Sequence, residues 1–291
     1  MALSYRGVAQ AALSACCFAT LSIFIRFAYD AGATTATILG FRFFLAAILL
    51  WGAVIATGKL PLVRRRDWLP LSLLGTLGYG LMSACFAQSV HYLSASLAAL
   101  LLYLYPSIVT LLSFWLGHVR YSHDKVLALL LSLAGLLLTI GMQGDFSWTG
   151  VGFGLGAAVI YSLYLLCSAQ VLKNIDPLIS TAVICTAAAI SYLLYGAASG
   201  SLQFALPLTA WLAIGGMAIV PTFAAMLLLF SAMRAIGAAR TSVVSTLEPL
   251  ATVILSMLFL AETLLPLQFV GGGLILAGIL LLELRSAAET N

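Results

Sequence analysis

Long apolar segments follow one another along the whole chain, separated by short polar or charged stretches. Each is about 20 residues long, the length that a helix needs to cross a hydrocarbon layer of about 30 Å. The segments do not alternate apolar and polar residues as the strands of a membrane barrel would. The pattern therefore predicts an all-α integral membrane protein with ten transmembrane helices. The expected helices span approximately residues 6–28, 34–57, 68–91, 95–117, 124–142, 149–172, 178–199, 207–232, 238–260 and 265–284.

Composition agrees with a protein surrounded by lipid. The chain has 291 residues, of which 63% are hydrophobic and 8% charged, whereas soluble domains carry about 25% charged residues. The five cysteines lie inside apolar segments and lack the spacing of a metal or redox motif, so we expect no metal and no cofactor. The net charge of +4 requires no nucleic-acid partner, because basic residues beside anionic lipid serve as topology signals.

The basic residues predict how the helices are oriented. Eleven of the thirteen lysines and arginines fall at one set of helix ends, the same set that carries both chain termini. Cytoplasmic loops of membrane proteins are enriched in lysine and arginine. We therefore expect both termini to be cytoplasmic.

A displacement of 143 residues aligns the chain with itself. It pairs Trp68 with Trp211 and Pro106 with Pro249. Each copy holds five expected helices, and an odd number inverts the second copy in the membrane relative to the first. Inverted repeats around a central site are typical of secondary transporters. The expected units are a first five-helix repeat at 1–143, a second, inverted repeat at 144–286 and a cytoplasmic tail at 287–291.

Three segments carry a resemblance to a known family. They are "GFRFFLAAILL" from residue 40, "YLYPSIVTLLSFWLG" from residue 103 and "LEPLATVILSMLFLAETLLPLQFVGGGLILAGILLLE" from residue 247. Together with the duplicated layout, they resemble the drug/metabolite transporter superfamily, specifically its EamA-type ten-helix members, over the whole chain. Within that superfamily the chain looks closest to the bacterial aromatic amino-acid exporters.

This resemblance implies a bacterial inner-membrane protein with a central cavity between the repeats that opens alternately to each side. It also implies export of amino acids, metabolites or drugs without ATP hydrolysis, and the sequence contains no G-x-x-x-x-G-K-[ST] phosphate loop. One position departs from the family pattern. The first repeat has Val119 where the second has Glu262, although family members often carry an acid in both. The departure indicates that Glu262 caps a loop rather than acting in transport.

Helical spacing and the repeat together predict the residues that line the cavity. Tyrosine rings can stack against an apolar or aromatic side chain, while hydroxyls hold the polar end of a substrate. Serine and other small residues can instead serve ordinary helix packing in lipid. The candidate substrate-binding residues are Phe18, Tyr79, Ser83, Ala99, Tyr103, Tyr161, Tyr164, Ser242 and Thr246.

The two matched prolines and two intramembrane charges complete the candidate site. Pro106 and Pro249 each interrupt helical hydrogen bonding near the middle of an expected helix. They act either as hinges for alternating access or as static kinks. Arg42 and Glu248 lie well inside expected helices at similar depth, where charges should face the bundle interior. They can pair with each other; alternatively, Arg42 is structural, and Glu248 carries a coupling proton, binds a substrate ammonium or makes a structural contact.

The sequence as a whole favours a secondary transporter over its alternatives. A membrane-embedded enzyme lacks its ligands here, because there is no H-E-x-x-H and no pair of aspartates in one apolar segment. A channel would show rings of charge or a filter motif. Phosphorylated cargo, such as a nucleotide sugar, would require several cationic side chains in the cavity, and only Arg42 is available. We therefore expect hydrophobic or aromatic zwitterions, above all amino acids, as cargo, and a monomer is compatible with the pattern.

Overall fold

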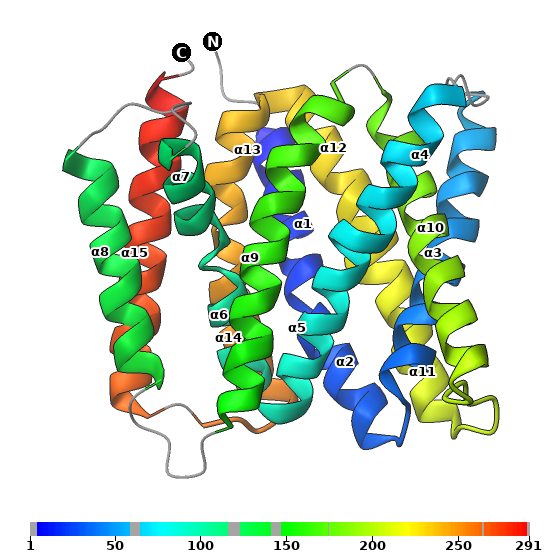
Figure 1. Ribbon diagram of the computed structural model, residues 1–291. Helices are drawn as coiled ribbons and strands as arrows, with labels where there is room; N and C mark the ends of the chain where they lie inside the picture. Colours follow the sequence, from blue (N-terminus) through cyan, green and yellow to red (C-terminus); the bar gives the residue numbers. More distant parts are fainter. Residues whose placement is uncertain are drawn as a thin grey trace.

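The computed structural model describes residues 5–58, 65–115, 123–140, 147–173, 175–263 and 265–289. Within these ranges every regular element is helical, and Figure 1 shows the helices side by side in one bundle. The elements are α1 (Tyr5–Ala19), α2 (Leu21–Asp30), α3 (Thr35–Ala56), α4 (Arg65–Leu73), η1 (Leu74–Gly80), α5 (Leu81–Tyr92), α6 (Ala95–Leu102), α7 (Tyr105–Trp115), α8 (His123–Ile140), α9 (Trp148–Val171), α10 (Pro177–Ala198), α11 (Leu208–Met217), η2 (Ala218–Ala224), α12 (Ala225–Ile236), α13 (Ala238–Ser245), α14 (Leu247–Phe259) and α15 (Pro266–Glu289).

Eight helical segments of the described chain are long and apolar enough to cross a membrane. This confirms the prediction of an all-α membrane protein. Several segments join consecutive elements, such as α1 with α2 and α11 with η2 and α12. The helices α8 and α15 occupy the places of the fifth and tenth expected helices. The expected helix ends near residues 117 and 142, and the repeat boundary at residues 143 and 144, lie outside the described residues.

Three of the expected helices are broken. The expected helix 6–28 is divided into α1 and α2 at Thr20. The expected helix 95–117 is divided into α6 and α7, and the expected helix 238–260 into α13 and α14. Pro106 lies in the first turn of α7 and Pro249 in the first turn of α14, where a missing amide donor costs no helical hydrogen bond. The prolines therefore start new helices rather than bend continuous ones as the sequence suggested.

The order of elements recurs at the displacement found in the sequence. The broken helices begin with α6 at Ala95 and α13 at Ala238, which is the same displacement, and the two π-helical segments begin at Leu74 and Ala218, one residue more than the displacement. Packing follows the same rule, because α3 packs against its counterpart α10 and α8 against its counterpart α15. The helix α5 packs against α9, and their counterparts at the displacement, α12 and α1, also pack against each other.

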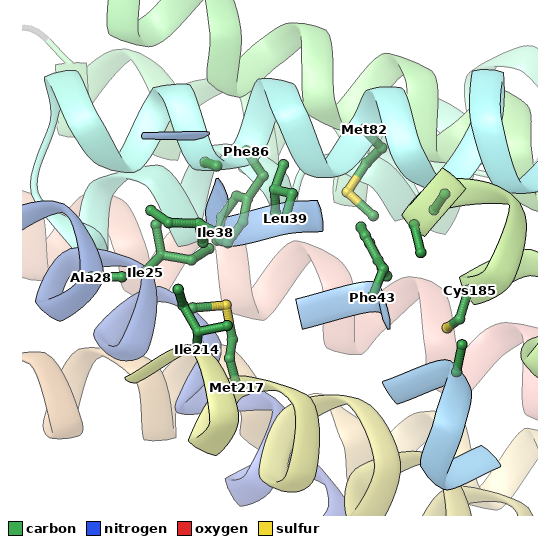
Figure 2. Close-up of a cluster of buried hydrophobic side chains, with 14 of the residues drawn as sticks. Ile25, Ala28, Ile38, Leu39, Phe43, Met82, Phe86, Cys185, Ile214 and Met217 are labelled. Atoms are coloured by element: carbon green, nitrogen blue, oxygen red, sulfur yellow. The ribbon is translucent and has the colours of Figure 1, made fainter. Parts of the chain in front are cut away.

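Small residues let paired helices approach closely. A Cβ atom placed on Gly278 of α15 would lie 2.6 Å from the carbonyl oxygen of Ala128 in α8, and one on Gly271 would lie 2.7 Å from that of Gly135. Such close contact provides the van der Waals packing that holds helices together where lipid removes the hydrophobic driving force. The larger apolar core lies among α2, α3, α5, α10 and α11, where Figure 2 shows Ile25, Ile38 and Ile214 pointing toward one another.

Glu262 caps a helix of the other half of the chain. It follows α14, and its carboxylate accepts hydrogen bonds from the amides of Ala95 and Ser96 at 2.6 and 3.1 Å and from the Ser96 hydroxyl at 2.7 Å. These amides belong to the first turn of α6, whose free donors favour an anion. Glu262 therefore has the capping role expected from the sequence, although it caps the helix α6 and not the loop in which Glu262 itself lies.

We predict that Glu262→Ala lowers the stability of the protein by about 1–3 kcal/mol, because it leaves the first amides of α6 without their charged acceptor. Thermal unfolding in detergent measures the change. The control is Asp30→Ala, which removes an exposed acid at the end of α2. Equal unfolding temperatures for the two variants would contradict the capping role.

Candidate functional site

Arg42 is held between the two π-helical segments. It lies in α3 and is only 1% exposed. Its Nε donates a hydrogen bond to Thr222 Oγ1 at 3.1 Å, and its Nη2 donates to the Tyr79 hydroxyl at 3.4 Å. Tyr79 belongs to η1 and Thr222 to η2. The guanidinium carbon also lies 4.8 Å from the centroid of the Phe43 ring, a cation–π contact.

The π-helical segments supply carbonyl groups that side chains satisfy. The Thr222 hydroxyl donates to the carbonyl of Met217 at 2.9 Å, and the Tyr192 hydroxyl donates to that of Gly80 at 2.7 Å. In η1 a side chain on Gly75 would collide with the carbonyl oxygen of Ile184, 2.6 Å from its Cβ, so glycine lets α10 approach this segment. Widened turns of this kind recur at functional sites, and here they position Tyr79 and Thr222 around Arg42.

Five tyrosines form a continuous series of ring contacts, which we call the tyrosine group: Tyr79, Tyr103, Tyr105, Tyr161 and Tyr164. The ring centroids of Tyr79 and Tyr164 lie 5.9 Å apart, as do those of Tyr161 and Tyr164. Tyr161 meets Tyr105 edge-on at 4.7 Å, and Tyr105 lies 6.3 Å from Tyr103. These distances fall within the range of favourable aromatic pairs. The group therefore connects η1, α9, α7 and the C-terminal end of α6.

Glu248 lies at the far end of this series from Arg42. It is in the first turn of α14, is half-buried and interacts electrostatically with Tyr103. It also interacts electrostatically with Tyr79 and Tyr161. Within the described chain, no ion pair within 4 Å joins Glu248 to Arg42. The tyrosines, and not a direct salt bridge, connect the two intramembrane charges.

At each helix break, one main-chain carbonyl lacks the amide donor that a continuous helix would supply. Because residue 106 is proline, the carbonyl of Leu102 has no amide donor four residues ahead, and Pro249 has the same effect on Ser245. At the second break, the Thr246 hydroxyl donates to the carbonyl of Val243 at 2.7 Å. Broken helices that expose main-chain polar groups are typical of binding sites in transporters.

The structure brings six predicted residues together: Arg42, Tyr79, Tyr103, Tyr161, Tyr164 and Glu248. The remaining candidates lie on α1, α5, α6 and α13 or at the break after α13. Ser83 of α5 and Ala99 of α6 are each 3% exposed and are packed among helices. Ser242 lies within α13, Thr246 at the break that follows it, and Phe18 is half-buried in α1. Among the described ring contacts, none joins Phe18 to the tyrosine group.

Two residues of the site were not among the sequence candidates. Tyr105 links Tyr103 to Tyr161, and Thr222 binds Arg42. The displacement of 143 residues would have identified both, because it pairs Tyr105 with Glu248 and Thr222 with Tyr79. Candidates chosen in one half of the chain thus identify further residues of the same cluster in the other half.

A separate surface cleft of about 490 Å³ lies where α2 ends and α11 begins. Its lining residues are Phe24, Phe27, Asp30, Ala31, Thr209, Leu212 and Ala213. None of these belongs to the tyrosine group. In the part of the chain that the structure describes, no three His, Cys, Asp or Glu residues are grouped to hold a metal ion.

One family model matches the chain twice, over residues 5–141 and 148–284, and it describes the EamA-like transporter family. The chain belongs to the EamA-like transporter family. The two matches cover nearly all of the sequence and correspond to the two sets of recurring elements. The family resemblance seen in the sequence is thereby confirmed, and the protein is a membrane transporter.

Curated relatives of this EamA-family protein are also named as transporters. An "uncharacterized transporter" from Archaeoglobus fulgidus is 28% identical over 280 residues, covering 94% of this chain and 95% of the relative. The "uncharacterized transporter YcbK" of Bacillus subtilis is 27% identical, covering 88% of this chain and 86% of its own length. The "uncharacterized inner membrane transporter YhbE" of Escherichia coli is 26% identical over 58% of this chain and 56% of its own length.

The fold is also found in a solved crystal structure. That protein superposes with a TM-score of 0.70 at 19% sequence identity, over 96% of this chain and 98% of the other. The likeness extends over the whole bundle, so the EamA-family chain has a fold already seen by experiment.

We predict that Thr222→Val lowers stability by about 1–3 kcal/mol, because it removes the acceptor of a buried, charged donor on Arg42. Thr222→Ser keeps the hydroxyl and is the matched control, with a smaller loss expected. Thermal unfolding of both purified variants in detergent makes the comparison. If valine were tolerated as well as serine, the hydrogen bond to Arg42 would contribute nothing.

Proposed function

We propose that this EamA-family protein is a secondary transporter that exports small metabolites across the bacterial inner membrane, with amino acids, including aromatic ones, as its cargo. The observation that carries the proposal is the tyrosine group, which links Glu248 to Arg42 next to two broken helices. Such a site offers aromatic faces for an apolar side chain and polar groups for its charged end.

The proposed architecture is ten transmembrane helices in two inverted repeats, at residues 1–143 and 144–286, followed by a short cytoplasmic tail. The double match of the family model and the recurrence of elements support the duplication. In Figure 1, α6 and α7 rise toward the end of the bundle where α1 begins, whereas α13 and α14 descend from it. Opposite directions for matching elements are expected of an inverted repeat.

The proposed orientation places the end of the bundle where α1 begins in the cytoplasm, with both termini. The described basic residues Arg6, Lys173, Arg234 and Arg240 lie at this end, close to the start of α1 or to the ends of α9, α12 and α13. The positive-inside rule supports this assignment.

Alternating access requires that one end of the site be closed. At the end opposite the termini, Glu262 joins the start of α6, and Thr34 donates from its amide to Gln203 at 2.9 Å and from its hydroxyl to the Ser201 carbonyl at 2.6 Å. These contacts connect the first half of the chain to the second. We infer that these contacts hold the two halves together at the proposed outer end.

The proposed binding surface comprises the tyrosine group and the candidates around it. Phe18, Ser83, Ala99, Ser242 and Thr246 extend it onto α1, α5, α6 and α13. The Nε and Nη2 groups of Arg42 donate to Thr222 and Tyr79. Phosphorylated cargo, such as a nucleotide sugar, would need several cationic side chains in the site, so we do not expect it to be transported.

Flux into liposomes tests the function. We expect the purified protein to transport radiolabelled phenylalanine, tryptophan or threonine, and not a nucleotide sugar, with protein-free liposomes as the control. An imposed pH gradient shows whether a proton moves with the cargo. Flux of the nucleotide sugar alone would overturn the cargo assignment while leaving the transporter assignment intact.

We predict that Pro106→Ala and Pro249→Ala each slow transport, because alanine restores an amide donor and favours a continuous helix through the break. Initial rates of phenylalanine uptake measure the effect, and Pro61→Ala, which lies outside both breaks, is the control. Wild-type rates in both variants would show that neither proline is a hinge.

A further inference from the structure

We propose that the surface cleft between α2 and α11 binds a phospholipid whose headgroup carries a primary ammonium group. The cleft has a volume of about 490 Å³, within the range of about 300–1,000 Å³ that is typical of ligand pockets. Its lining comes from both halves of the chain, because α2 belongs to the first half and α11 to the second. The inference goes beyond the proposed function, since it concerns a lipid and does not depend on the cargo.

The cleft runs along one face of each helix. Its lining residues share one face of α2, at Phe24, Phe27 and Asp30, and one face of α11, at Thr209, Leu212 and Ala213. The two helices run in opposite directions, and α2 ends and α11 begins at the end of the bundle opposite the termini (Figure 1). A Cβ atom placed on Gly216 would lie 2.8 Å from the Phe24 ring. Phe24 therefore packs against α11 at the deep end of the cleft.

The polarity of the lining changes with depth. Asp30 is the last residue of α2, and Thr209 is in the first turn of α11. Phe24 lies six residues before Asp30, which corresponds to about 9 Å along the helix, and the lining residues between these two levels are apolar. The cleft is thus polar where the bundle leaves the hydrocarbon layer and apolar within that layer. This order matches a lipid in its normal orientation, with the headgroup above its chains.

The acid at the polar end determines which headgroup fits. Asp30 is exposed, and no residue of the described chain forms an ion pair or hydrogen bond with its carboxylate. Arg26, one turn before it, donates to the main-chain carbonyl of Leu93 instead. A primary ammonium group donates charge-assisted hydrogen bonds to a carboxylate, whereas an anionic headgroup is repelled. The Thr209 hydroxyl, which also has no partner among the described residues, can donate to the lipid phosphate.

The apolar part of the cleft has exposed side chains that an acyl chain can cover. Leu212 is 64% exposed and Phe27 is 38% exposed. A hydrocarbon chain between them contacts α2 and α11 at once, while its headgroup is held at Asp30. The bound lipid would therefore join the two halves of the chain at this end of the bundle.

Native mass spectrometry of the purified full-length protein tests the inference with two lipids that have the same acyl chains. Dioleoyl-phosphatidylethanolamine carries the primary ammonium group, and dioleoyl-phosphatidylglycerol carries a net negative charge. We expect the first to bind about three- to tenfold more tightly, the size of one charge contact at an exposed site. Glycerophosphoethanolamine, which has the headgroup without the chains, should not compete.

Asp30→Asn tests the headgroup contact. We expect the preference for phosphatidylethanolamine to disappear, because the amide neither attracts the ammonium group nor repels the anionic lipid. Asp67→Asn is the matched control, since it removes an acid from the first turn of α4, at the other end of the bundle. Thermal unfolding in detergent without added lipid confirms that both variants are folded.

Leu212→Ser tests the chain contact. We expect it to weaken binding of both lipids about three- to tenfold, because it removes apolar surface from the cleft. Leu194→Ser is the matched control: Leu194 of α10 is 66% exposed and does not line the cleft. This control should bind both lipids as the wild-type protein does.

Equal affinities for the two lipids, or an unchanged preference in a folded Asp30→Asn protein, would overturn the inference. Equal losses in Leu212→Ser and Leu194→Ser would show that the chain binds elsewhere and would also overturn it. Competition by glycerophosphoethanolamine would indicate a soluble zwitterion in place of a lipid, and a dimer that binds no lipid would assign the cleft to a second copy. Phenylalanine flux is measured separately, so none of these results decides the proposed function.

Discussion

The hydrocarbon interior of a membrane offers no hydrogen-bond partner, and this constraint determines where the chain can depart from a regular helix. The departures inside the bundle include η1, η2 and the breaks after α6 and α13. At the first three, a side-chain hydroxyl donates a hydrogen bond to a main-chain carbonyl of the irregular segment or next to it. Tyr192 donates to Gly80 in η1, Thr222 to Met217 just before η2, and Ser162 to Tyr105 just after the break that follows α6. Polar side chains therefore gather where the backbone is irregular.

Arg42 contacts two of these irregular segments and positions a residue of the candidate site there. A buried guanidinium needs acceptors, and the two π-helical segments provide them from both halves of the chain through Tyr79 and Thr222. The contact that satisfies the charge also holds Tyr79 against Phe43 and Tyr164. The orientation of the first tyrosine in the group is thus set by a buried charge.

Much of this arrangement can be predicted from the sequence, because the lengths of the apolar segments and the 143-residue displacement can both be read directly along the chain. They predicted an all-α membrane protein, and they selected Arg42, Glu248 and four of the five grouped tyrosines. They did not predict that the expected helices 95–117 and 238–260 are broken, since a proline in an apolar segment is compatible with either a kink or a new helix. Nor did they show that Arg42 binds Thr222, because that contact depends on how α3 crosses η2 in three dimensions.

The displacement pairs Glu248 with Tyr105, so the two halves of the chain differ at the candidate site. Two identical half-length chains, assembled as an antiparallel dimer, would place the same residue at both positions and so present two acids or none. A single carboxylate facing tyrosines requires the halves to differ. In one chain each half can carry its own residue at such a position, and here one half carries an acid and the other a tyrosine.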